Sequence, residues 1–146
     1  MNMTSFRLIL TKRWLGFFAL FFGVWYPVSL LIVSAYEVTG HPLLFIAGNV
    51  FTPLWTLFVS FLYFRKAPDD WPSRFITAFG WIALMFVFSA ILVKPIYGYP
   101  WTSIINVDVL NANWINVIAI VIGGFAAHKT GLNHQEDAET EPIEFF

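Results

Sequence analysis

Cysteine is absent from the 146-residue sequence, and charged residues make up only 12% of it. The absence of cysteine excludes disulfides, thiolate metal sites, iron–sulfur clusters and thiol redox chemistry. The charged fraction is about half of the roughly 25% that is typical of soluble domains. The formal net charge of −1 provides no basic surface for nucleic acid, so no nucleic-acid partner is expected.

Hydrophobic residues supply 58% of the chain, and the mean hydropathy is +0.70. A membrane-spanning helix needs about 20 consecutive, mostly apolar residues. Three stretches, at about 14–36, 43–64 and 75–96, approach or meet that length. In a fourth, at about 109–128, the uninterrupted apolar part is shorter and runs from Trp114 to Ala127. Hydropathy alone therefore leaves the fourth crossing open.

The basic residues decide between three and four crossings, because cytoplasmic loops next to spans collect Lys and Arg. With four crossings, only Lys94 lies outside. The other seven of the eight basic residues then lie on the cytoplasmic side: Arg7, Lys12, Arg13, Arg65, Lys66, Arg74 and Lys129. The sequence therefore predicts an all-α integral membrane protein, an antiparallel four-helix transmembrane bundle with both termini in the cytoplasm.

Three regions follow from this topology. Residues 1–13 form a basic cytoplasmic segment, residues 14–129 the transmembrane domain, and residues 130–146 an acidic, disordered cytoplasmic tail. The small residues from Val33 to Ala35 resemble a signal-peptidase site, so cleavage after Ala35 is an alternative. The apolar run is longer than the ~7 to 15 residues of a signal core, which favours an uncleaved span. We expect a bacterial inner membrane, since no organelle-targeting segment precedes the first span.

Small or polar side chains recur along one face of each predicted span, at steps of three and four residues. In the second span these residues are Asn49, Thr52, Thr56 and Ser60, and in the fourth they include Asn116. A compact bundle with these faces inward and the aromatic faces outward is expected. Hydrogen bonds between helices are the simpler role for the polar stripe, and a hydrated path or ligand groove is the other.

The fourth span begins with three asparagines and a tryptophan. Asn111 and Asn113 are expected either to cap the helix or to line the outer mouth near Glu37 and Lys94. Capping is favoured, because an asparagine side chain meets unpaired backbone N–H groups at a helix start. Trp114 is expected to anchor this helix at the membrane surface.

Two predicted inward faces end in a charge at the outer surface, Glu37 on the first span and Lys94 on the third. Because an ion near the membrane interface seeks a partner, we expect these two to pair. His41 and Asp108 join them as further candidates, so the four form a candidate binding cluster at the outer mouth.

No catalytic motif accompanies this cluster. The sequence has no Gly-rich phosphate loop, nucleophile elbow or paired-histidine motif. No two of the three histidines have the spacing of helical metal ligands, and no metal or other cofactor is predicted.

Three functions remain open. The first is an accessory, assembly or structural subunit of a larger membrane complex. The second is a small homo-oligomeric transporter or channel for a neutral or weakly polar solute. The third is an interfacial lipid-modifying enzyme with Glu37, His41 and Asp108 as acid or base. The expected partners are the lipid bilayer with either a larger complex or further copies of the chain.

Overall fold

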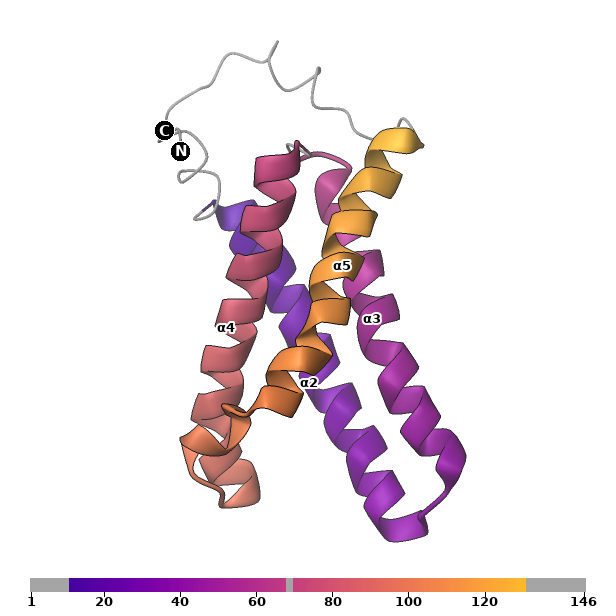
Figure 1. Ribbon diagram of the computed structural model, residues 1–146, viewed down its shortest axis with the longest axis vertical. Helices are drawn as coiled ribbons and strands as arrows, with labels where there is room; N and C mark the ends of the chain where they lie inside the picture. The colour runs from indigo at the N-terminus through magenta and orange to yellow at the C-terminus, as the bar shows by residue number, and fades with distance from the viewer. Residues whose placement is uncertain (1–10, 68–69, 131–146) are drawn as a thin grey trace.

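The computed structural model describes residues 11–67 and 70–130, and helix makes up 89% of them, with no strand. Most of the predicted basic segment and the acidic tail lie outside the described residues. These residues form four long helices, labelled in Figure 1, and one short 3-10 helix: α2 (Lys12–Thr39), α3 (Pro42–Phe64), α4 (Trp71–Tyr97), η1 (Trp101–Ile104) and α5 (Val107–Lys129). The predicted all-α four-helix fold is confirmed.

Each of the four long helices has the length and composition of a membrane span. The shorter ones, α3 and α5, have 23 residues. At 1.5 Å per residue such a helix is about 35 Å long, more than the ~30 Å hydrocarbon core of a bilayer. The fourth helix, which hydropathy left open, is thus long enough. The chain has the character of an integral membrane protein with four candidate spans.

A short turn makes α2 and α3 antiparallel. α2 ends at Thr39, and the capping residue Gly40 has a φ of 62°, in the left-handed region that favours glycine. α3 begins with Pro42, whose fixed φ suits the first helical position. The Nδ1 atom of His41 accepts a hydrogen bond from the N–H of Leu43 at 3.3 Å and caps α3. The His41 side chain therefore serves as the N-cap of α3.

The connection from α4 to α5 is longer and contains η1. The Asn106 side chain accepts a hydrogen bond from the N–H of Val109 at 2.8 Å and caps α5. The prediction that Asn111 and Asn113 cap this helix is therefore wrong. Asn106 is an equally good capping residue, and no Gly or Pro stands between it and Asn111, so the helix begins earlier.

The helices α3 and α5 pack closely because small residues face each other. A Cβ atom at Gly123 of α5 would overlap the Ser60 hydroxyl of α3 and lie 3.0 Å from the Leu57 carbonyl oxygen. α3 also packs along α2, and α4 packs on α5. α3 therefore lies between α2 and α5 in the bundle.

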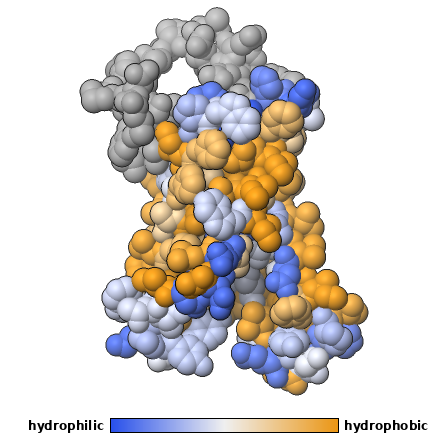
Figure 2. Space-filling model, in the orientation of Figure 1, coloured by the Kyte–Doolittle hydropathy of each residue, from blue (hydrophilic) through white to orange (hydrophobic). Residues whose placement is uncertain are grey.

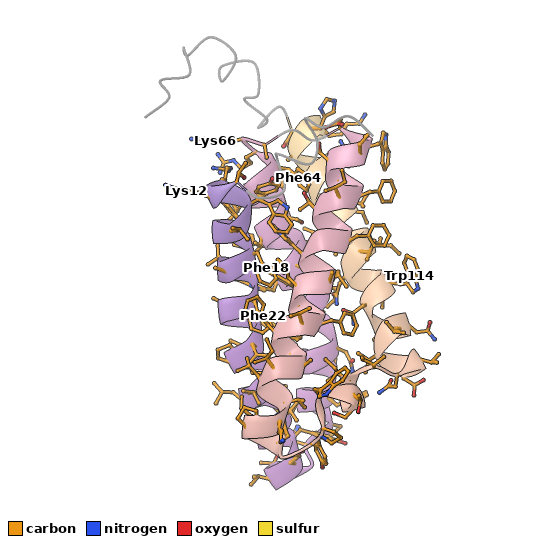
Figure 3. The ribbon with its side chains drawn as sticks, turned by 90° about the vertical axis from the view of Figure 1, so that its left-hand side faces the viewer. Lys12, Phe18, Phe22, Phe64, Lys66 and Trp114 are labelled. Carbon is orange, nitrogen blue, oxygen red and sulfur yellow. The ribbon has the colours of Figure 1, made fainter. Side chains whose placement is uncertain are left out.

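Between α2 and α4 the core is aromatic. The ring of Trp81 is fully buried, with its centroid 5.4 Å from that of Tyr63 and 6.0 Å from that of Phe21. Figure 3 shows Phe18, which stacks on Phe22 with the centroids 5.9 Å apart, on the side of α2 that faces α4. The large rings join helices whose backbones make few direct contacts.

The expected small inward face of α2 is wrong. Gly16 and Gly23 are exposed, and a Cβ at either would meet no atom within 4 Å. Aromatic side chains bury 150–250 Å² each, roughly, so interlocking them gains more contact than the close approach of two glycine faces. α4 likewise buries an aromatic residue instead of a small one, since Trp81 is buried and Ala83 is exposed.

Trp114 does not mark an end of the bundle. Figure 3 shows its side chain near mid-height, pointing away from the other helices. It is 57% exposed and packs edge-on against Phe79 of α4, with the centroids 6.4 Å apart. The expected role as a surface anchor therefore disagrees with its position.

The two ends of the bundle differ in charge and in packing. One end, called the basic end here, holds Lys12, Arg13, Arg65, Lys66, Arg74 and Lys129, and Figure 3 labels two of them. At the opposite end, called the open end, the α2–α3 hairpin diverges from α4 and the start of α5 (Figure 1). Figure 2 shows an apolar belt between two more hydrophilic ends and a division of the molecule at the open end.

Candidate ligand-binding cleft

A cleft of about 400 Å³ lies in the half of the bundle nearer the open end, and all four long helices line it. Its walls include the rings of Trp25 from α2 and Phe86 from α4. No Asp, Glu, Lys, Arg or His is among its lining residues. Its polar groups are neutral and belong to Tyr26, Asn49, Thr52, Ser89, Tyr97, Asn113 and Asn116.

The cleft closes within one helical turn toward the basic end. Trp25, Thr52, Met85 and Asn116 line it, one from each long helix. One turn farther along, each helix has a side chain with 0% exposure: Phe21, Thr56, Trp81 and Ile120. The cleft is therefore closed toward the basic end by this buried layer.

The polar face of α3 divides between the cleft and the core. Asn49 and Thr52 line the cleft, whereas Thr56 and Ser60 are fully buried. Thr56 donates a hydrogen bond to the Thr52 carbonyl oxygen at 2.7 Å, and Ser60 donates to that of Leu57 at 2.9 Å. These two hydroxyls therefore bond within α3 and do not form the expected hydrogen bonds to another helix. Because their donors are satisfied, α5 can pack closely against them.

One hydrogen bond from the α3 stripe does cross between helices. The indole N–H of Trp25 in α2 donates to the Thr52 hydroxyl at 3.0 Å. This bond orients the Trp25 ring as a wall of the cleft and satisfies an indole N–H that would otherwise be unpaired in an apolar setting.

A pair of asparagines on α5 forms the most buried polar part of the cleft. Asn116 donates to the Asn113 side-chain oxygen at 3.1 Å, and Asn113 donates to the Val109 carbonyl oxygen at 2.8 Å. Asn116 is only 6% exposed, and its own carbonyl oxygen has no partner among the described residues. The side-chain oxygen of Asn116 is not among the buried polar atoms without a partner, so it is accessible from the cleft, where a ligand can donate a hydrogen bond to it.

Further neutral groups face the same space. The hydroxyls of Tyr26, Ser89 and Tyr97 have no hydrogen-bond partner within residues 11–67 and 70–130. Asn49 donates to the Phe45 carbonyl oxygen at 3.0 Å, which leaves its side-chain oxygen as another acceptor. The cleft thus combines aromatic walls with several neutral donors and acceptors.

The structure does not bring the predicted outer-mouth residues into one cluster. Glu37, His41, Lys94 and Asp108 are all exposed near the open end, on different helices or helix ends. No ion pair joins any two of them in the described part of the chain. Glu37 lies in the last turn of α2 and Lys94 in the last turn of α4.

Sequence reasoning identified part of the cleft and missed its α4 wall. Asn49, Thr52 and Asn116 were predicted to face the interior, and all three line the cleft. Ser89 and Tyr97 were not singled out. They stand eight residues apart on α4, so the same periodicity test that selected the α3 stripe would have placed them on one face.

The chemistry of the described residues points to binding by neutral groups. No set of three His, Asp or Glu side chains able to hold a metal ion occurs in the described ranges. No known family model, curated protein or solved structure matches this chain.

Proposed function

We propose that the protein binds a neutral, partly apolar small molecule with hydrogen-bonding groups in the cleft, as a small transporter or a ligand-binding subunit. The observation that carries the proposal is a charge-free cleft lined by all four long helices. Its volume of about 400 Å³ lies within the ~300–1,000 Å³ of typical ligand sites.

The absence of charge in the lining selects the class of ligand. An ion that entered such a site would lose its hydration without gaining an opposite charge, which is costly. A neutral molecule loses less, and the amide of Asn116 and the hydroxyls of Ser89 and Tyr97 can replace its hydrogen bonds to water. Aromatic walls favour an apolar body that also dissolves in a bilayer.

The charges at the basic end support an orientation. Six basic residues lie where α2 and α4 begin and where α3 and α5 end. By the rule that basic residues stay on the cytoplasmic side, this end faces the cytoplasm, in a bacterial inner membrane. The cleft then opens toward the outside, so its ligand arrives from the outer medium or the outer leaflet.

An accessory or assembly subunit is the second candidate, and the closed floor of the cleft favours it. A single copy offers no path past Phe21, Trp81 and Ile120 in this conformation. Transport would need this core to open, whereas a subunit that holds a ligand for a partner complex would not. Lipid modification is less favoured, because His41 caps α3 and lies apart from the cleft lining.

A matched pair of asparagine substitutions tests the proposal. The full-length protein in lipid nanodiscs is titrated with neutral quinones, isoprenoid alcohols and fatty amides, and with a fatty acid and an alkylammonium as ionic counterparts. We expect saturable binding of a neutral probe. Asn116→Leu should raise the dissociation constant by about 2- to 13-fold, because it removes one hydrogen bond with a net contribution of about 0.5–1.5 kcal/mol. Leucine has the same number of side-chain heavy atoms as asparagine and the same branch at Cγ, so it keeps the shape of the side chain while removing its hydrogen-bonding groups.

The control is Asn111→Leu, an exposed position outside the cleft, which should leave binding unchanged. Equal binding of the ionic counterparts, or an Asn116→Leu protein that binds like the wild type, would contradict the proposal. Helix content and a single size-exclusion peak establish that each variant is folded.

A further inference from the structure

A second hollow, called the α4 groove here, lies between α4 and the segment around η1, with a volume of about 510 Å³. Phe86 and Ile104 line both the groove and the cleft, so they form the wall between the two. The rest of the groove is apolar apart from Lys94, its only charged lining residue.

The spacing of the lining residues gives the groove a direction. Phe86, Ala90 and Lys94 are four residues apart and lie on one face of α4. Eight residues at 1.5 Å each make about 12 Å along the helix. The small side chain of Ala90 leaves the hollow between the two larger ones. The groove therefore runs from an apolar interior toward a single cation at the open end.

Lys94 differs from the other basic residues of the described chain. It alone lies near the open end, while the remaining six lie at the basic end. It is exposed and forms no ion pair with another described residue. Lysine side chains at such sites lay their apolar stem along a hydrophobic surface and keep the ammonium at the polar edge. Neither Glu37 nor Asp108 forms an ion pair with it, so the ammonium is available to a ligand.

An anionic phospholipid has the complementary layout, a negative phosphate at the membrane surface and an acyl chain below it. Trp101 also lines the groove and is 58% exposed, at a place where tryptophan suits headgroup depth. We infer that the α4 groove holds one acyl chain of an anionic phospholipid whose phosphate contacts the Lys94 ammonium. The inference depends on the helices crossing a bilayer and does not depend on the ligand of the cleft.

Photo-crosslinking tests this site, because mapping the labelled residues distinguishes a lipid in the α4 groove from an anionic lipid bound at the basic end. The full-length protein is placed in nanodiscs that contain phosphatidylglycerol or phosphatidylcholine with a diazirine on the acyl chain. Crosslinked residues are then mapped by mass spectrometry. We expect phosphatidylglycerol to label residues 86–91 more than phosphatidylcholine does. Lys94→Gln should lower this labelling about five-fold, the usual effect of one basic residue at an anionic surface, and Lys94→Arg should preserve it.

Filling the groove gives an independent test. Ala90→Phe should abolish the labelling of residues 86–91, and so should Val87→Trp, at a position that is 54% exposed and away from the core. Ala47→Phe, an exposed position on α3 outside the groove, and Lys66→Gln at the basic end should leave it unchanged.

Three results would overturn the inference. They are equal labelling by the two lipids, unchanged labelling in the Lys94→Gln protein, and unchanged labelling in both filled variants. Helix content and a single size-exclusion peak serve as the folding check for every variant.

Discussion

Trp25 contributes both to the packing of α2 against α3 and to the wall of the cleft. Its ring forms a wall of the cleft, and its indole N–H donates to Thr52 across the α2–α3 interface at 3.0 Å. Hydrogen bonds between membrane helices contribute on average about 0.6 kcal/mol, because the unfolded chain in the membrane also finds partners. The bond therefore orients the ring more than it stabilises the fold.

A double-mutant cycle measures this bond. Trp25→Phe and Thr52→Val each remove one partner, and we expect a coupling free energy of about 0.6 kcal/mol between them in unfolding from mixed micelles. The control cycle pairs Thr52→Val with Trp114→Phe, whose ring packs against Phe79 outside the cleft. That cycle should be additive. Additivity in both cycles would mean that the Trp25–Thr52 bond contributes nothing to stability.

Single residues also explain which parts of the cleft were predictable. Asn49, Thr52 and Asn116 stand out in apolar spans, because each polar side chain there needs a reason to be buried. Asn113 was assigned to a helix cap, but it bonds to Asn116 inside the cleft. Its role depends on where α5 begins, and that boundary depends on the competing cap at Asn106.

At the scale of the helices, the close contact of α3 with α5 depends on Gly123. We expect Gly123→Ala to destabilise the fold by about 1–3 kcal/mol, because the added methyl group overpacks the interface and must displace Ser60 or the α3 backbone. The measurement is the free energy of unfolding in mixed micelles.

The matched control is Gly23→Ala on α2, where no atom lies within 4 Å of the added Cβ. It should be neutral or slightly stabilising, since alanine is the better helix former by about 1 kcal/mol. An equal loss of stability in the two variants would show that close packing at Gly123 is not the cause.

Helix faces were harder to predict than helix positions. The small residues of α5 are buried against α3, as expected, whereas those of α2 are exposed. Both helices carry an equally regular small face in the sequence. The difference arises because α5 meets the small, self-bonded hydroxyl of Ser60, whereas α2 meets the large ring of Trp81.

At the scale of the whole molecule, the charges at the two ends predict an orientation in the membrane that a labelling experiment can test. The chain has no cysteine, so one introduced thiol is a unique reporter. Ser103→Cys places it on η1 near the open end, and Lys66→Cys places it at the basic end. In intact cells, an impermeant maleimide should label the first variant and should label the second only after permeabilisation. The reverse pattern would place the cleft on the cytoplasmic side.

Four apolar helices, each long enough to cross a membrane, follow from the amino-acid sequence alone. These properties are local, because transfer into lipid depends on the side chains of each segment and on the charges beside it. The burial of aromatic rings by α2 and α4, and the meeting of Asn49, Ser89 and Asn116 in one cleft, appear only in the folded bundle. Those outcomes depend on how side chains from different helices fit one another, and a pattern along one helix does not contain that information.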